Sequence, residues 1–323
     1  MTCVVAVIAI GRNEGARLEA CLASVKGKAD RVIYVDSGSV DNSVAMARAS
    51  GAEVVELSAD KPFTAARARN AGFSQLSNGA SPDFVQFVDG DCVVVDGWMQ
   101  AATQALLDDP KLGIVTGWRS EIQPEKSIYN DLCDFEWHRP AGRIVTCGGD
   151  MMVRPQAFES AGGFDATVIA AEDDEFCVRL RAQGWQIRRI PVNMTRHDAA
   201  MLRFGQWWQR AVRSGHGFAQ VGHMHPPYFA REQKRVLAYG AALPLLAAVF
   251  LASWAAGLWI VVAIYGFNYL RTYKGLVAEG MLPKRARNHS VFLTLSKIPN
   301  MLGMTRFHWR RLKGRSMQII EYK

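Results

Sequence analysis

Two acidic residues separated by a single glycine, Asp89-Gly90-Asp91, form the pattern in this sequence with the clearest capacity for chemistry. They directly follow an apolar run at residues 84–88, which predicts a buried strand. In open α/β sheets, ligands bind at the carboxyl ends of the strands. Two carboxylates at that edge can share one hard cation and leave coordination positions free for phosphate oxygens. An ordinary Asp-Gly hairpin turn is the alternative interpretation.

Two further polar residues are expected near the same edge of the sheet. Asp36 ends a predicted strand at residues 31–35, where its carboxylate can accept a hydrogen bond from a base or a ribose, or can cap the following turn. Arg69 lies in the first turns of a predicted helix at residues 64–75, and its guanidinium suits a diphosphate. A solvated helical face is the alternative interpretation for Arg69.

Four consecutive acids, Glu172-Asp173-Asp174-Glu175, open another predicted helix. The helix dipole stabilises acids in this position, so ordinary capping is one interpretation. The dipole also favours the ionised carboxylate that a general base needs at neutral pH. Arg179 follows Glu175 by four residues, the spacing of a helical ion pair.

The histidines receive different interpretations. His197 follows a strand predicted at residues 186–190, expected at the edge of the sheet because Pro191 comes next. It can act as a metal ligand only if the fold returns it to Asp91. His216, His223 and His225 lie in or beside a predicted loop at residues 217–227, where we expect them to be exposed to solvent.

The elements that must position these residues alternate along the first part of the chain. Residues 3–10, 31–35, 53–57, 84–88 and 111–118 have the apolar patterns of strands, and helical patterns lie between them. Repeated βα units of this kind predict an α/β fold, with a mostly parallel sheet and helices on both of its faces. Residues 122–143 are predicted to form a long loop with short helical pieces, and the domain is predicted to end near residue 227.

A long apolar stretch follows this predicted domain. Residues 237–270 contain no charged side chain, and one straight helix of that length would measure roughly 51 Å, more than the ~30 Å hydrocarbon core of a bilayer. Two apolar segments that form a hairpin or a re-entrant pair fit better. Lys and Arg flank the stretch on both sides, which favours the cytoplasmic side for both ends. A buried pair of core helices is the alternative interpretation.

Charge and cysteine content narrow the class of protein. After Leu270 there are twelve Lys and Arg but only two Asp and Glu, so the tail accounts for more than the whole net charge of +8. A basic tail beside an apolar run favours anionic lipid, and no recognition motif supports nucleic acid as a partner. Six scattered cysteines without a Cys-x-x-Cys pair favour a reducing compartment. The glycine patterns of dinucleotide-binding folds and P-loops are missing.

Several motifs in order resemble a known family. They are Gly11-Arg12-Asn13-Glu14 after the first strand, Val35-Asp36-Ser37-Gly38-Ser39-Val40-Asp41, Ala68-Arg69-Asn70-Ala71-Gly72, Asp89-Gly90-Asp91, Gly148-Gly149-Asp150, and Glu172-Asp173-Asp174-Glu175 with Arg179. This series, which covers about residues 3–215, resembles the inverting family-2 glycosyltransferases of the GT-A fold, a Rossmann-like α/β arrangement. The resemblance implies a membrane-associated enzyme that uses a nucleotide-diphosphate sugar, with a UDP-sugar as the expected donor.

The same resemblance implies a role for each matching residue. On the donor side, Asp36 would contact the base, Arg69 would lie near the diphosphate, and Asp89 would lie toward the ribose or the metal. Asp91, with Asp89 and His197, would bind Mg²⁺ or Mn²⁺. Asp173 would be the general base. Glu172, Glu175 and Asp150 are expected on the acceptor side.

The C-terminal part of the chain bears on the acceptor. Processive relatives carry Gln-x-x-Arg-Trp, whereas this chain has Gln206-Trp207-Trp208-Gln209-Arg210-Ala211, which favours transfer of one sugar. We therefore expect a catalytic domain at 1–227 on the cytoplasmic face of a bacterial inner membrane, and a membrane-associated hairpin with a basic tail at 228–323. The expected acceptor is lipid-linked and belongs to exopolysaccharide or glycolipid synthesis. Two alternatives remain open: transfer to a polyprenyl phosphate, and a non-catalytic scaffold that binds nucleotide.

Overall fold

A computed structural model describes residues 3–79 and 81–321, which divide into two compact units. The first unit contains the described residues up to Glu125 together with Cys133–Ala200, and the second contains Lys126–Leu132 and the described residues from Met201 onward. The boundary expected at 227 differs from this division. Helix α8 (Phe204–Met224) falls in the second unit because it packs along α13 (Lys297–Leu312).

Within the described residues of the first unit, nine strands form one sheet in the order β3-β2-β1-β4-β8-β6-β9-β5, and β7 pairs with β9. The strands are β1 (Val5–Gly11), β2 (Arg31–Asp36), β3 (Glu53–Glu56), β4 (Phe84–Asp89), β5 (Cys92–Val94), β6 (Leu112–Glu121), β7 (Gly142–Ile144), β8 (Met151–Val153) and β9 (Gln186–His197). Strands β3, β2, β1 and β4 are parallel, as predicted. Strand β8 runs antiparallel to β4 and β6, so the sheet as a whole is mixed.

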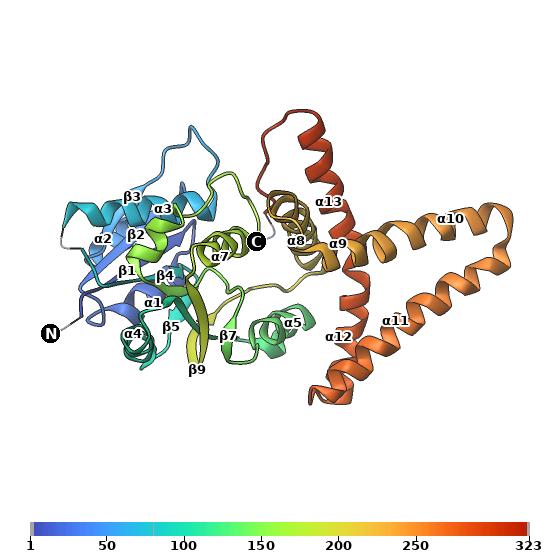
Figure 1. Cartoon of the computed structure of the whole chain (residues 1–323), viewed down its shortest axis with the longest axis horizontal. Coiled ribbons are helices and arrows are strands. Elements are labelled where there is room, and N and C mark those ends of the chain that lie inside the picture. The colour runs from blue at the N-terminus through green and yellow to red at the C-terminus, as the bar shows by residue number, and fades with distance from the viewer. Residues whose placement is uncertain (1–2, 80, 322–323) are drawn as a thin grey trace. The chain divides into compact units, whose positions relative to one another are not determined.

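Helices cover both faces of this sheet, which confirms the predicted α/β fold (Figure 1). The helices of this unit are α1 (Ala16–Val25), α2 (Ser43–Ala49), α3 (Ala65–Gln75), α4 (Trp98–Asp108), α6 (Pro155–Ser160) and α7 (Glu172–Ala182), and α5 (Ile128–Trp137) lies in the predicted loop region. Successive side chains of a strand point to opposite faces. Along β1, Ala6 and Ile8 therefore join the core under α3, α6 and α7, whereas Val7 and Ala9 join the core under α1, α2 and α4.

Strand β9 corrects the prediction of a short edge strand at residues 186–190. It continues through Pro191 to His197 and lies between β6 on one side and β5 and β7 on the other. The register with β6 shifts between Thr116 and Trp118, and this irregularity accommodates a proline that cannot donate a ladder hydrogen bond. Because the strand continues, His197 lies opposite Cys92 of β5.

The second unit is helical, and α8 corrects a second prediction. Residues 217–224 are the last two turns of α8 and not a loop. Gly215 and Gly303 allow the backbones of α8 and α13 to approach closely, since a Cβ on either glycine would meet backbone atoms of the other helix at 1.9 Å. His216 is consequently buried against Phe307, contrary to the expected exposure, whereas His223 is exposed as expected.

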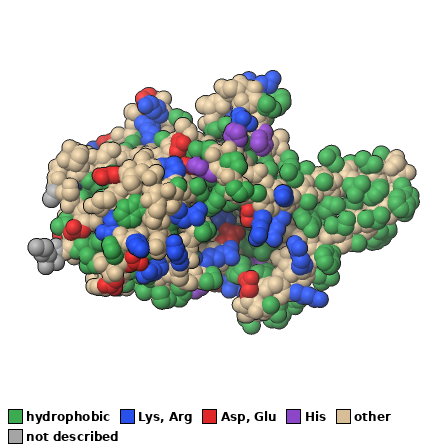
Figure 2. All heavy atoms as spheres, in the orientation of Figure 1, with side chains coloured by type: hydrophobic (Ala, Val, Ile, Leu, Met, Phe, Trp, Pro, Cys, Tyr) green, Lys and Arg blue, Asp and Glu red, His purple; other side chains and the backbone are tan. Residues whose placement is uncertain are grey.

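The apolar stretch forms the predicted pair of segments. A helical run over Ala230–Ser253, which ends in α10 (Leu243–Ser253), is long and apolar enough to cross a membrane. The chain breaks at Trp254, turns at Ala255–Gly257 and returns as α11 (Leu258–Ala278), which leads to α12 (Pro283–Leu295) (Figure 1). We call α10, this turn and α11 the hairpin. Hydrophobic side chains spread over its surface (Figure 2), and several are more than half exposed: Leu245, Val249, Leu251, Trp254, Trp259, Val262 and Phe267.

Candidate active site

The carboxyl ends of three neighbouring strands bring the first predicted residues together. Asp36 ends β2 and Asp89 ends β4, and both strands pair with β1. In the ladders Asp36 lies beside Gly11 and Asp89 lies beside Ile10, so the two carboxylates flank the end of β1. This is the edge at which α/β sheets bind ligands.

Asp36 is engaged by the turn that follows it. Its Oδ2 accepts hydrogen bonds from the amides of Gly38 and Ser39, at 2.9 and 2.8 Å, and its Oδ1 accepts one from the Tyr34 hydroxyl at 3.0 Å. The side chain is buried, with 2% of its surface exposed. The structure thus supports the turn-capping interpretation, and contact with a base stays a prediction.

Arg69, on α3, connects two of the acidic elements. Its guanidinium donates to Asp89 Oδ1 at 2.8 Å and to Glu172 Oε1 at 2.9 Å, and its side chain is buried. Glu172 therefore faces Arg69, and its place on the acceptor side stays a prediction. Two carboxylates already neutralise this arginine, so its clearest contribution is to hold Asp89 and the start of α7 in place.

Gly149 makes the position of Arg69 possible. A Cβ on Gly149 would lie 2.0 Å from Nη2 of Arg69, far inside any real contact distance. At the neighbouring Gly148, a Cβ would meet only Oδ2 of Asp173, at an ordinary 3.8 Å. The Gly148-Gly149-Asp150 motif thus contains one glycine that the arginine requires and one that it does not.

Arg119, which lies on β6, was not among the predicted site residues. Its Nη2 contacts Asp89 Oδ2 at 3.2 Å and Asp150 Oδ2 at 2.6 Å, and the guanidinium lies over the Trp137 ring at 5.3 Å. Burial alone would raise the pKa of Asp89, but Arg69 and Arg119 together hold it below its ordinary value. The signal that could have revealed this residue was the length of the strand, since β6 continues three residues beyond the predicted end at 118 and carries Arg119.

Asp150 and Glu175, for which the acceptor side was predicted, are both engaged by protein donors. Asp150 is 1% exposed and accepts hydrogen bonds from the Asp89 amide, Arg119 and the Thr195 hydroxyl. Glu175 is also 1% exposed and forms a two-pronged ion pair with Arg179, at 2.7 and 2.6 Å. These contacts let both carboxylates hold neighbouring elements in place, and their contact with an acceptor stays a prediction.

His197 returns to Asp91, which was the condition for its predicted role. The Nε2 atom lies 3.2 Å from Asp91 Oδ2, and both side chains are buried. Nδ1 lies 3.9 Å from Glu121 Oε2, and Trp137 packs edge-on against the ring. One ligand atom each from Asp91, Cys92 and His197 lie within 4.8 Å of one another. A carboxylate and an imidazole suit Mn²⁺, and the carboxylate suits Mg²⁺, so this donor pair fits the predicted cation.

Asp173 lies at the start of α7 and is partly buried. Burial and the neighbouring carboxylates of Glu172 and Asp174 raise its pKa to about 8, while Arg69 opposes the shift. The sequence predicted that the helix dipole would favour the ionised form. In the structure, burial and two adjacent acids favour the protonated form instead. The result is a carboxyl group with a pKa close to neutral pH.

Comparison with known proteins identifies the family. The sequence model of glycosyl transferase family 2 matches residues 6–153, and that of glycosyl transferase family group 2 matches residues 130–294. The chain belongs to glycosyltransferase family 2. The first match includes the acids of the sheet edge, and the second includes the four acids of α7 and reaches into α12.

Two curated relatives of this family-2 chain show the range of its similarity. The pre-mycofactocin glycosyltransferase of Mycobacterium tuberculosis is 27% identical over 237 residues, which cover 69% of this chain and 48% of that protein. The poly-β-1,6-N-acetyl-D-glucosamine synthase of Staphylococcus aureus is 26% identical over 227 residues, which cover 65% of this chain and 52% of that protein. The chain thus spans about half the length of these relatives.

A solved structure supports the GT-A fold. The mannosyltransferase from Pyrobaculum calidifontis, in complex with GDP-Man and Mn²⁺, aligns with 96% of this chain and 88% of its own. The TM-score is 0.66 at 19% sequence identity. At this identity the likeness concerns the fold alone.

Proposed function

We propose that this chain transfers one sugar from a nucleotide-diphosphate sugar to a hydroxyl group of a lipid-linked acceptor, with inversion at the anomeric carbon. The observation that carries the proposal is that Arg69 links the elements which carry two chemically different acids. Asp91 pairs with His197 as a cation-binding donor set, and Asp173 has a pKa of about 8, suited to proton transfer at neutral pH. Arg69 connects the two regions through Asp89 and Glu172.

The proposed reaction is a single displacement. Asp173 accepts the proton of the acceptor hydroxyl as that oxygen forms a bond to the anomeric carbon, and the bond to the donor diphosphate breaks. Proton transfer of this kind contributes typically ~10²–10⁴-fold to a rate. Mg²⁺ or Mn²⁺, held by Asp91 and His197, would neutralise the charge on the departing diphosphate. Arg69 and Arg119 fix the orientation of Asp89 next to that position.

The hairpin supports the lipid-linked acceptor and the membrane location. Its exposed apolar side chains would be stable in lipid and costly in water. Basic residues on both sides of it favour the cytoplasmic face, so we place the catalytic unit at the inner face of a bacterial membrane. Ala211 supports transfer of a single sugar, because it stands where the Gln-x-x-Arg-Trp motif of processive relatives has tryptophan.

The first experiment is binding of UDP, GDP and dTDP to the purified chain in Mn²⁺, and then in EDTA. We expect tight binding of one nucleotide that EDTA abolishes, with UDP the predicted one. Asp91→Ala should weaken Mn²⁺-dependent binding at least tenfold, whereas Asp96→Ala, an exposed acid in a loop nearby in sequence, should not change it. Unchanged affinity in Asp91→Ala would refute the metal role. Absence of binding to any nucleotide by folded protein would favour the non-catalytic scaffold.

A further inference from the structure

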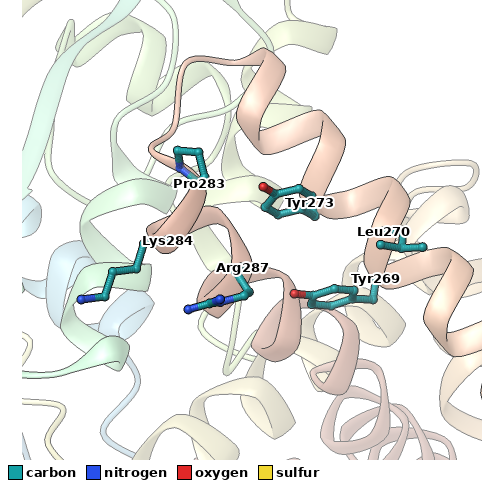
Figure 3. A pocket seen from close by; sticks show the side chains of 6 residues that line it. All are labelled: Tyr269, Leu270, Tyr273, Pro283, Lys284 and Arg287. Atoms are coloured by element: carbon teal, nitrogen blue, oxygen red, sulfur yellow. The ribbon is translucent and has the colours of Figure 1, made fainter.

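A pocket of about 460 Å³ lies between α11 and α12 in the second unit. Six residues line it: Tyr269, Leu270 and Tyr273 from α11, and Pro283, Lys284 and Arg287 from the start of α12. Tyr269 and Tyr273 lie one helical turn apart, and their hydroxyl groups point toward the α12 side (Figure 3). The lining thus combines two phenol groups, two cations and an apolar wall.

The charge of the pocket is entirely positive. Lys284 and Arg287 are one turn apart on α12, and their cationic ends extend to the same side in Figure 3, away from the tyrosine rings. Both side chains are exposed and free to turn toward a ligand. Neither forms an ion pair with any residue in the described part of the chain, and no acidic side chain lines the pocket. Arginine and lysine with nearby hydroxyl donors suit a phosphate group.

The hairpin sets the depth of this pocket relative to a membrane. Tyr269 follows the turn residue Ala256 by thirteen residues on the same arm, so it lies roughly 20 Å from the tip at about 1.5 Å per residue. One leaflet of the hydrocarbon core is about 15 Å deep, half of the ~30 Å total. A hairpin whose tip reaches the middle of the bilayer would therefore place the pocket at the level of the lipid headgroups.

The residue types along α11 agree with this depth. Trp259, Val262 and Phe267 are exposed and apolar on the tip side, and Arg271 and Lys274 begin the polar side. Tyrosines are enriched where apolar and polar zones meet, because their rings prefer the headgroup level. The pocket coincides with that boundary.

We propose that this pocket binds the phosphate of an anionic phospholipid headgroup and so fixes how deep the hairpin sits in the membrane. Lys284 and Arg287 would pair with the phosphate, and Tyr269 and Tyr273 would donate hydrogen bonds to it. The acyl chains would then lie along the exposed apolar surface of α11. The inference rests on the membrane association proposed above and not on glycosyl transfer.

The test measures binding of the full chain to sedimented vesicles of phosphatidylcholine alone and of equal parts phosphatidylcholine and phosphatidylglycerol. We expect tighter binding to the mixed vesicles. Lys284→Gln with Arg287→Gln should remove most of that preference, roughly 30-fold for two charges near an anionic surface. Both residues are exposed, so the double variant should keep the melting temperature of the parent chain. Binding to phosphatidylcholine alone, which the hairpin provides, should stay unchanged.

A matched control separates the pocket from general attraction. Lys313→Gln with Arg315→Gln removes the same charge from exposed positions of the same unit, outside the pocket. Equal losses in the two double variants would overturn the proposal, as would equal binding to the two kinds of vesicle. Binding of glycerol 3-phosphate in solution that competes with mixed vesicles at micromolar concentration would reassign the pocket to a soluble phosphate ester. Failure to bind any vesicle would refute membrane association as well.

Discussion

At the scale of single residues, the site shows how one side-chain type acquires different chemistry. Asp89 and Asp173 are both aspartates held near Arg69. Two arginines surround Asp89 and lower its pKa, whereas burial and two acids raise the pKa of Asp173 to about 8. Asp89 therefore stays ionised, and Asp173 can exchange a proton near neutral pH.

Replacement of Asp173 by Asn should remove the proposed base while preserving shape. We expect sugar transfer to fall by roughly 10²–10⁴-fold, with nucleotide affinity within about twofold of the parent chain. The measurements are a transfer assay and nucleotide titration of the same preparation. A fully active variant would point to an acceptor that needs no base, such as a polyprenyl phosphate.

The pH dependence of transfer should follow the ionisation of Asp173. Only the ionised carboxylate accepts a proton, so kcat/KM should increase with pH and reach half of its maximum near pH 8. Well below that pH, kcat/KM should fall about tenfold for each pH unit. Of the two carboxylates that raise this pKa, Glu172 has the larger effect, and Glu172→Gln removes it. The same change leaves Arg69 with one carboxylate fewer to neutralise it, so the midpoint should move to lower pH. Glu175→Gln, on the same helix but paired with Arg179, should leave the midpoint in place. A midpoint that Glu172→Gln does not move would argue against Asp173 as the titrating group.

At the scale of elements, the site depends on the approach of the 148–150 segment to α3. Gly149 is the point of contact, since any side chain there would occupy the position of the Arg69 guanidinium. Arg69 forms ion pairs with Asp89 of β4 and Glu172 of α7, so a displacement of this arginine would break its contacts with both elements.

Gly149→Ala should therefore displace Arg69 and lower both stability and transfer. We expect a loss of about 1–3 kcal/mol in the free energy of unfolding, the usual cost of an overpacked site. Gly148→Ala is the matched control, because its Cβ would meet only an ordinary contact with Asp173. Urea unfolding of the two variants gives the comparison. Equal stability of Gly149→Ala and Gly148→Ala would contradict the steric argument.

At the scale of the whole molecule, the chain joins two units with different surfaces. The first encloses two cores on either side of a sheet, whereas the second exposes the apolar side chains of its hairpin. Surfaces as apolar as this hairpin mark sites of contact with lipid or with another protein. The proposed lipid acceptor and the headgroup pocket both depend on the first of these explanations.

A charge in the hairpin should therefore weaken membrane binding without unfolding the chain. Leu251 is 70% exposed on α10, and Leu251→Glu should reduce binding to phosphatidylcholine vesicles by roughly tenfold or more, given the cost of a carboxylate in hydrocarbon. Val40→Glu, at a position 90% exposed in the first unit, is the control and should bind as the parent chain does. Equal vesicle binding by Leu251→Glu and the parent would show that the hairpin stays outside the lipid.

The features that depend on local pattern could be predicted from the sequence alone. Apolar runs bounded by turn residues predicted β1, β2 and β4, and the placement of Asp36 and Asp89 at their carboxyl ends followed from the parallel arrangement. The uncharged stretch at 237–270 predicted a pair of apolar segments in the same way. These predictions succeeded because side-chain period and turn chemistry act over a few residues.

The folded structure was needed to reveal the contacts between residues far apart in the chain. It returned His197 to Asp91 through an interior strand that the sequence placed at the edge, and it revealed Arg119 between Asp89 and Asp150. It also placed Glu172 beside Arg69, and it raised the pKa of Asp173 through burial and the neighbouring carboxylates. Desolvation and ion pairing depend on which groups the folded chain brings within a few ångströms, and a pattern along the sequence does not contain those distances.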